Sequence, residues 1–283
     1  MKSHSKAKAA LAMTAVCSWW LLVSPVQAGI SIRGGLTHER VVQPGNTYEG
    51  TVTIINTGQE EQAVEIYQTD YRFNCSGEYY YDEPGTNSRS NAPWVDFSPH
   101  AALVPLGGAV DVGYTITVPE DERLTGTYWS IMMIEVDNDR PDGTAADKAD
   151  RITLGIKQVV RYGVQMVSHV GDAGQRRLDF LDTRILKAGG ERVLEVDLEN
   201  VGEQWLKPLV WAELYDQTGE FKGRFDGGTL RIYPGTSARY SVDLSGVPGG
   251  EYKAVVVADC GADDVFGATY LVIFEHEDQF TVH

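Results

Sequence analysis

The chain has 283 residues, a formal net charge of −16 and a hydrophobic fraction of 42%. Nucleic acid and anionic membrane surfaces are poor partners for such an acidic chain, because phosphate binding needs clustered Lys and Arg. The length fits two domains of about 100–150 residues each better than one small sandwich.

Residues 1–28 have the pattern of a cleaved export signal. Three lysines precede the apolar run LAMTAVCSWWLLV, and the small-residue sequence VQA ends at Ala28. We therefore predict a Sec-type signal peptide that is cleaved after Ala28, and a mature chain that is periplasmic or secreted. No later apolar run reaches the ~20 residues of a membrane-spanning helix, so we do not expect the mature chain to span a membrane.

The next segments read as strands separated by Gly, Pro, Asn and Asp. PGNTYEGTVTIINTG (44–58) is a turn, an alternating strand and an Asn-x-Gly sequence. After it comes the loop NCSGEYYYDEPGTNSRSNAPW (74–94), in which Tyr79, Tyr81 and Trp94 are aromatic groups that could stack on sugars or anchor a protein. No window predicts a long helix.

AVDVGYTITV (109–118) is typical of a half-buried antiparallel strand, because its apolar residues alternate with polar ones. The residues that share its apolar face are Val110, Val112, Tyr114, Ile116 and Val118.

The strand predicted at 128–136 is apolar on both faces. One face carries Tyr128, Met132, Ile134 and Val136, and the other carries Trp129, Ile131 and Met133. A half-buried strand has one wet face, so something must cover the second one. The cover is the 74–94 loop, the second domain or a separate partner protein. If it is a partner, Trp129, Ile131 and Met133 are partner-binding residues and Trp129 is protected only in the complex.

A long regular strand is expected near residues 156–166. Its apolar positions, Ile156, Val160, Tyr162, Val164 and Met166, alternate with Lys157, Arg161, Gly163 and Gln165. At a sheet edge this strand could accept an added strand from a partner, and inside a sheet it would pair only within the chain.

The second half of the chain repeats the plan of the first. AGGERVLEVDLENVG (188–202) resembles residues 44–58 and again ends in Asn-x-Gly, and SARYSVDLS (237–245) is another alternating strand. We therefore predict an all-β protein with two immunoglobulin-like β-sandwich domains in tandem after the signal peptide, at 29–170 and 175–283. Cys75 and Cys260 remain in the mature chain, and whether they form a disulfide stays open.

The first domain resembles two known families. PGNTYEGTVTIINTG, APWVDFSPHAALVPLGGAVDVGYTITVPED and GTYWSIMMIEV are similar to the first domain of periplasmic pilus-assembly chaperones and to the immunoglobulin-like domain of WxL-interacting surface proteins. The chaperone resemblance implies that a subunit's terminal carboxylate is held between the domains by Arg33 and Lys157. The surface-protein resemblance implies binding to cell-wall polymer or to another surface protein.

The sequence contains no recognisable catalytic arrangement. The histidines are scattered, and there is neither a zinc-type spacing nor a nucleophile elbow. The acidic segment EVDNDRPDGTAADKAD (135–150) departs from a calcium loop because Pro141 occupies a ligand position and no Glu closes it. We expect no enzyme activity, no metal and no cofactor.

These observations favour a non-catalytic exported protein-binding module, a periplasmic chaperone or assembly factor for envelope or surface proteins. Its partner would be an exported or surface protein subunit, and its oligomeric state stays open. The alternative is a cell-surface module that binds carbohydrate or cell-wall polymer through Tyr79, Tyr81 and Trp94.

Overall fold

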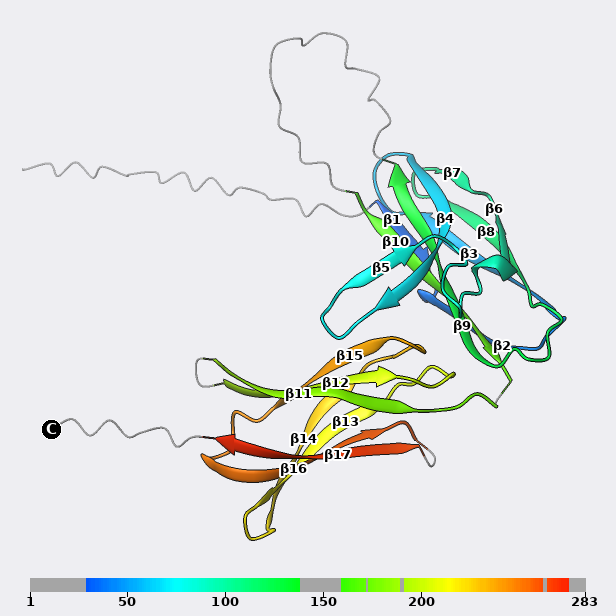
Figure 1. Ribbon diagram of the computed structural model, residues 1–283. Coiled ribbons are helices and arrows are strands. Elements are labelled where there is room, and N and C mark those ends of the chain that lie inside the picture. Colours follow the sequence, from blue (N-terminus) through cyan, green and yellow to red (C-terminus); the bar gives the residue numbers. More distant parts are fainter. Residues whose placement is uncertain (1–28, 138–158, 172, 189–190, 262–263, 275–283) are drawn as a thin grey trace, which may run out of the picture.

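The computed structural model describes residues 29–137, 159–171, 173–188, 191–261 and 264–274, and these form two β-sandwiches (Figure 1). The first contains β1 (Ile30–Arg33), β2 (Thr37–Val42), β3 (Thr47–Asn56), β4 (Gln62–Phe73), β5 (Tyr79–Asp82), β6 (Val95–Ser98), β7 (Ala101–Val104), β8 (Ala109–Thr117), β9 (Gly126–Asp137) and β10 (Arg161–Val170), with a short 3-10 helix η1 (Ala92–Trp94). The second contains β11 (Leu178–Ala188), β12 (Glu191–Asn200), β13 (Leu209–Asp216), β14 (Phe221–Thr229), β15 (Ser237–Asp243), β16 (Gly250–Asp259) and β17 (Val265–Phe274). The predicted fold class, two tandem immunoglobulin-like sandwiches, is confirmed.

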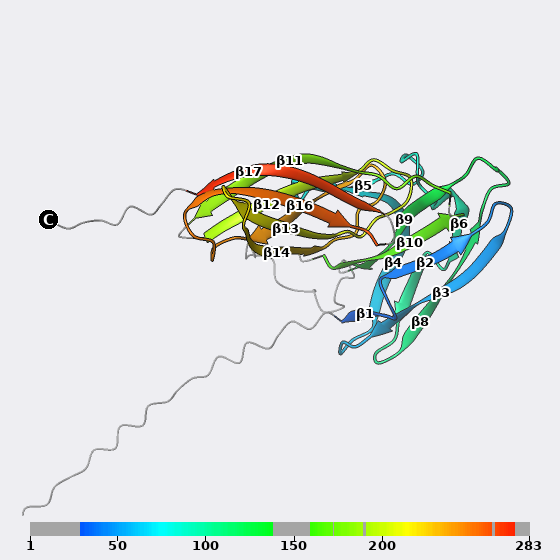
Figure 2. The same ribbon diagram turned by 90° about the horizontal axis from the view of Figure 1, so that it is seen from below.

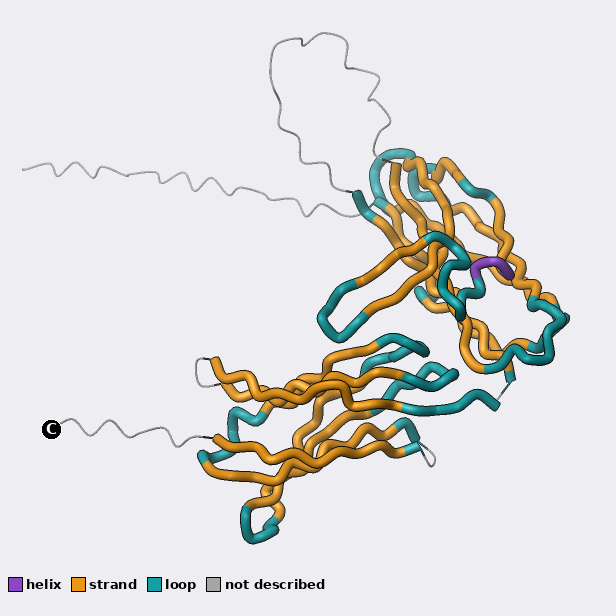
Figure 3. Tube along the Cα trace, in the orientation of Figure 1, coloured by secondary structure: helices purple, strands orange, loops and turns teal. Residues whose placement is uncertain are grey.

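Each sandwich is made of two sheets. In the first they run β1-β3-β8-β6 and β2-β10-β9-β4-β5, with β7 also paired to β4. In the second they run β11-β12-β15 and β14-β13-β16-β17. Strands account for most of the described chain, as Figure 3 shows. No helix in the described residues is long and apolar enough to cross a membrane.

The first strand changes sheets. β1 pairs with β3, whereas β2 pairs in parallel with the second half of β10. Gly34, between them, has a φ of +91°, a conformation that favours glycine, so the chain can turn there from one sheet to the other. After this turn β2 lies beside β10, on the side away from β9, and pairs with it from Gln165 onward.

The alternation of apolar and polar residues along the strands determines which side chains enter the two cores, as the sequence predicted. In β8 the side chains of Val112, Tyr114 and Ile116 are buried, and in β12 those of Leu194, Val196 and Leu198 are. Burying each such aliphatic side chain stabilises the fold by about 1.5–3 kcal/mol relative to its exposed state.

The Asn-x-Gly sequences of the internal repeat make matching hydrogen bonds in both domains. The amide nitrogen of Asn56 donates to the carbonyls of Glu60 and Val104 at 2.6 and 3.0 Å, and its Oδ1 accepts from the N–H of Gly58 at 2.9 Å. Asn200 is equally buried, and its amide donates to the carbonyls of Gln204 and Ile232 at 2.7 and 3.0 Å. Its Oδ1 accepts from Gly202 N–H at 2.9 Å. The repeat therefore marks a buried amide that ties the end of one strand to a second segment.

Candidate functional site

The second domain covers the outer face of β9 at Trp129. The indole of Trp129 is fully buried and stacks on the ring of Tyr233, with ring centroids 4.7 Å apart and an angle of 12° between the planes. Its Nε1–H donates to the carbonyl of Tyr71 at 2.7 Å. Tyr233 belongs to the segment between β14 and β15, and its hydroxyl donates to Gln165 Oε1 at 2.7 Å. Of the three covers considered from the sequence, the second domain is therefore the one that the structure shows at Trp129.

Ile131 and Met133 pack over β10, the neighbouring strand of their own sheet. A Cβ on Gly163 of the neighbouring strand would lie 3.2 Å from Ile131 Cγ2 and 3.5 Å from Met133 Sδ, so both side chains lie over that glycine. The expectation that Trp129, Ile131 and Met133 form an exposed partner-binding face is therefore wrong, because all three are buried within a single chain. The 74–94 loop contributes a smaller part, since the backbone carbonyl of Arg89 accepts from the backbone N–H of Trp129 at 3.0 Å.

Polar contacts hold the two domains in one arrangement. Arg231 stacks over the Trp205 ring at 4.3 Å and donates to Glu39 Oε2 at 3.0 Å. His169 Nε2 lies 2.9 Å from Glu39 Oε1 and 3.1 Å from Nε1 of Trp205. These four groups form a continuous set across the junction. Glu39 and His169 lie on strands of the first domain, and Trp205 and Arg231 lie in two separate connections of the second.

Gly126 marks the closest backbone approach between the domains. Its φ is +81°, and a Cβ there would lie 2.2 Å from the carbonyl oxygen of Glu203. No side chain fits in that space, so glycine is required at this position. The Glu203 carbonyl instead accepts from the N–H of Thr127 at 2.8 Å, which fixes the start of β9 against the second domain.

The β4–β5 hairpin leans from the first domain onto the second. Figure 1 shows it pointing toward β15, and Figure 2 shows it at the junction of the two domains. The N–H of Cys75 donates to Ser237 Oγ at 3.0 Å, and the rings of Phe73 and Tyr233 meet edge to face at 6.4 Å. A pocket of about 320 Å³ remains beneath the hairpin, lined by its aromatic side chains and by Gln165, Arg231 and Arg239.

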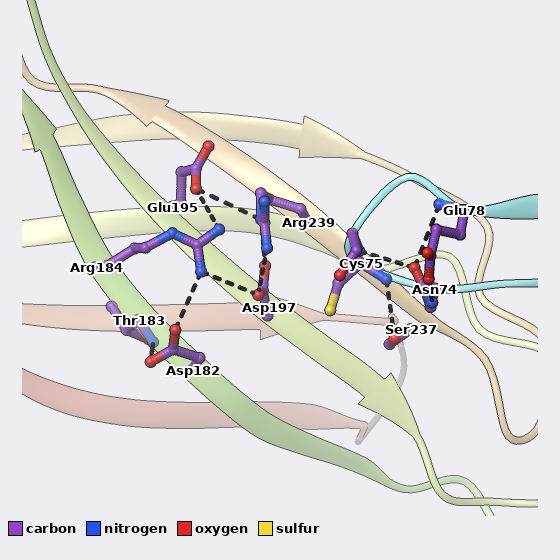
Figure 4. Close-up of polar contacts among 11 residues, drawn as sticks. Asn74, Cys75, Glu78, Asp182, Thr183, Arg184, Glu195, Asp197, Ser237 and Arg239 are labelled. Atoms are coloured by element: carbon purple, nitrogen blue, oxygen red, sulfur yellow. Dashed lines mark hydrogen bonds and ion pairs between the residues drawn. The ribbon is translucent and has the colours of Figure 1, made fainter. Parts of the chain in front are cut away.

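An ion cluster lies on the wall of the second domain that faces Cys75 (Figure 4). Arg239 binds Asp197 through two contacts of 2.7 and 2.8 Å, and Arg184 binds Glu195 at 2.6 Å. Hydrogen bonding to Arg239 lowers the pKa of Asp197 below its usual value. Because a lowered folded-state pKa means that ionised Asp197 stabilises the fold, this contribution is present at neutral pH and is lost as the pH falls through that pKa.

The exposed tyrosines of the hairpin form a small aromatic group. Tyr71 stacks against Tyr79 at 6.3 Å and Tyr81 at 5.7 Å, and 62% of Tyr79 and 54% of Tyr81 are exposed. Burial raises the pKa of Tyr71 well above its usual value, so its hydroxyl stays protonated. Trp94 does not belong to this group, because it packs against the first-domain core and against Tyr128 at 4.7 Å.

Among the described strands, β10 has a second neighbour along only part of its length. Along its whole length it pairs with β9, whereas β2 pairs only with Gln165–Val170. The N–H of Gln165 donates to Leu36 at 2.8 Å, and the Val160 carbonyl accepts from Val136 of β9 at 3.2 Å. Backbone groups alternate along a strand, so those of Arg161 and Gly163 point away from β9. On that side, no strand in the described part of the chain pairs with Arg161–Val164.

Of the two basic residues implied by the chaperone resemblance, only Arg33 lies within the described residues. Arg33 is the exposed last residue of β1 and pairs with Thr53 of β3. Lys157 and most of the 135–150 segment lie outside the described residues. Cys75 and Cys260 are both half-buried and unbridged. In the described residues no group of His, Cys, Asp or Glu could hold a metal ion.

Reasoning from the sequence missed the residues of the second domain that complete the junction. Tyr233, Trp205 and Arg231 lie in short connections rather than in periodic strands. The signal for them was the two aromatic residues themselves, in EQWLKP and RIYPG, each beside a second apolar residue.

Comparisons with known proteins place fimbrial chaperones among the structures that this chain resembles. No protein-family model matches the sequence, and no curated protein matches it either. The chain is similar to a structure described as a chaperone–tip adhesin complex of CFA/I fimbriae, with 14% identity, a TM-score of 0.44 and coverage of 87% of this chain and 100% of that one. It is also similar to the class 5 fimbriae chaperone CfaA, with 12% identity, a TM-score of 0.42 and coverage of 86% and 99%.

A third similar structure is the CsuC–CsuE chaperone–tip adhesion subunit pre-assembly complex from Csu pili of Acinetobacter baumannii. Its identity is 14%, its TM-score is 0.44, and the match covers 85% of this chain and 98% of that one. The pilus-assembly chaperones that the sequence resembles are thus also among the similar solved structures. The resemblance to WxL-interacting proteins stays a prediction.

Proposed function

We propose that this protein is a non-catalytic exported chaperone or assembly factor that binds another envelope or surface protein by adding a strand of that protein to β10. The observation that carries the proposal is the open edge at Arg161–Val164. An unpaired edge offers N–H and C=O groups in the spacing of a sheet, so an extended segment of another chain can continue the hydrogen-bond ladder.

Two further features support a binding role for this edge. The inner side chains of β10, among them Tyr162 and Val164, already pack on the first-domain core, so the strand is held in an extended form before a partner arrives. The junction of Trp129 with Tyr233 fixes the second domain beside the paired half of β10. A preorganised site binds with less loss of conformational entropy.

Export and the class of partner belong to the same proposal. The leader pattern of residues 1–28 supports export of the mature chain to the periplasm or out of the cell. A partner that reaches the same compartment is an exported protein, and the subunits of surface structures form one such class. Arg33 and Lys157 stay predicted contacts for its terminal carboxylate.

Site-specific photo-crosslinking tests the proposal. A photoreactive residue at Val159, which is 40% exposed beside the open edge, is expected to crosslink to an extended segment of one exported protein in the native envelope. The matched control is the same residue at Leu103, which is 48% exposed on β7. Equal adducts from both positions, or none from Val159, would count against the proposal.

A further inference from the structure

We propose that β17, the edge strand of the second domain, is the surface on which a second copy of this chain pairs, antiparallel and edge to edge. β17 has the sequence VFGATYLVIF, with no charged residue and no proline in ten positions. Its register with β16 is uninterrupted, so it is also free of bulges. Long, regular and uncharged edge strands readily pair with other chains.

The other edge strands of the described sheets carry protection that β17 lacks. β1, β5, β6 and β7 have only four residues each. The longer edge strands carry charged or titratable side chains, which are His38, Glu39 and Arg40 on β2 and Arg239 and Asp243 on β15. Two others combine charges with bulges. β11 has Asp182, Arg184 and Lys187 with one bulge, and β14 has Lys222, Arg224 and Asp226 with two. Because the chain has a net charge of −16, an uncharged edge is where two copies can meet without opposing carboxylates.

The hydrogen-bonding groups of β17 are directed outward at alternate residues. The N–H of Cys260 donates to the carbonyl of Asp264 at 3.0 Å, which makes this the first hydrogen-bonded pair of the β16–β17 hairpin. By alternation, the even-numbered residues of β17 bond to β16 and the odd-numbered ones face the free edge. The odd-numbered side chains are also the exposed ones, and 73% of Leu271 and 51% of Ile273 are accessible.

One register satisfies both the hydrogen bonds and the side chains. With a two-fold axis at Tyr270, the odd residues of one copy face odd residues of the other. Ile273 then lies opposite Gly267, and Leu271 lies opposite Thr269. A large side chain thus meets a small one at each step, and a Cβ built on Gly267 would make only an ordinary contact of 3.5 Å with the carbonyl oxygen of Val256. The four-stranded sheets of two copies would join into one sheet.

This surface is independent of the proposed partner site. β10 belongs to the first domain, and β17 belongs to the sheet of the second domain that lies farther from the first, as Figure 1 shows. A change on β17 therefore leaves the β10 edge untouched. Loss of pairing at one edge is therefore distinguishable from loss at the other.

Sedimentation equilibrium of the purified full chain across a wide concentration range tests the proposal. We expect a monomer–dimer equilibrium for the unaltered chain, and a rise of more than about tenfold in its dissociation constant in Leu271→Lys. A second variant, Thr269→Pro, removes an outward N–H and leaves the bonds to β16 in place, and it should have the same effect. The matched control, Leu186→Lys, changes a leucine of β11 that is 45% exposed and should dimerise like the unaltered chain.

Three results would overturn the proposal. They are a monomer at every concentration, a dimer that persists in both β17 variants, and a dimer that Leu186→Lys weakens as much as Leu271→Lys does. Circular dichroism and the unfolding midpoint of each variant establish that it is folded.

Discussion

The Tyr233→Ala variant is expected to lose about 3–5 kcal/mol of its free energy of unfolding, the range for truncating a buried aromatic side chain. Two interactions of the Tyr233 side chain are lost. Truncation removes the ring that stacks on Trp129 at 4.7 Å, and it leaves Gln165 Oε1 without the hydroxyl that donates to it at 2.7 Å. Chemical denaturation followed by circular dichroism gives the loss, and the fluorescence of Trp129 should shift to longer wavelength as water reaches it.

The control for this variant is Tyr80→Ala. Tyr80 lies on the exposed β5 strand and contacts Glu78 and Arg72 at the surface, so its removal should leave the unfolding midpoint nearly unchanged. If Tyr233→Ala and Tyr80→Ala behaved alike, the cover of Trp129 would have to come from the first domain alone.

The Arg161→Pro variant is expected to lose partner binding, with recovery of the protein crosslinked from Val159 falling by at least about tenfold. Proline removes the N–H that points to the open edge and places its ring in the path of an added strand. The bonds of Tyr162 and Val164 to β9 remain, because their backbone groups point the other way.

Arg161→Ala is the matched control, because both variants lose the contact of 2.7 Å between Arg161 and Glu135. Only the proline variant loses the backbone donor. Equal recovery with the two variants would mean that the edge of β10 does not pair with the partner.

Much of the fold could be predicted from local sequence. The alternation in 109–118 and 237–245 set which side chains enter each core, and the repeated Asn-x-Gly sequences indicated two domains of one plan. The structure adds the reason for the repeat, since Asn56 and Asn200 are buried amides with matching partners.

The candidate site could be predicted only in part, because it depends on contacts between distant residues. The two apolar faces of β9 correctly indicated a second layer over Trp129. Local periodicity has no information on a stacking partner 104 positions further along the chain. The sequence therefore could not show that the second domain, through Tyr233, is the cover at Trp129. The burial of Ile131 and Met133 over Gly163 was equally hidden, because it depends on the register of β9 with β10.

Backbone amide hydrogen exchange of the isolated chain, resolved by NMR, tests the open edge of β10 most directly. We expect the amides of Arg161 and Gly163 to exchange at least about a hundredfold faster than those of Tyr162 and Val164, which are bonded to β9. Equal protection of all four amides would contradict this expectation, because the edge proposed for a partner would then already be paired within the chain.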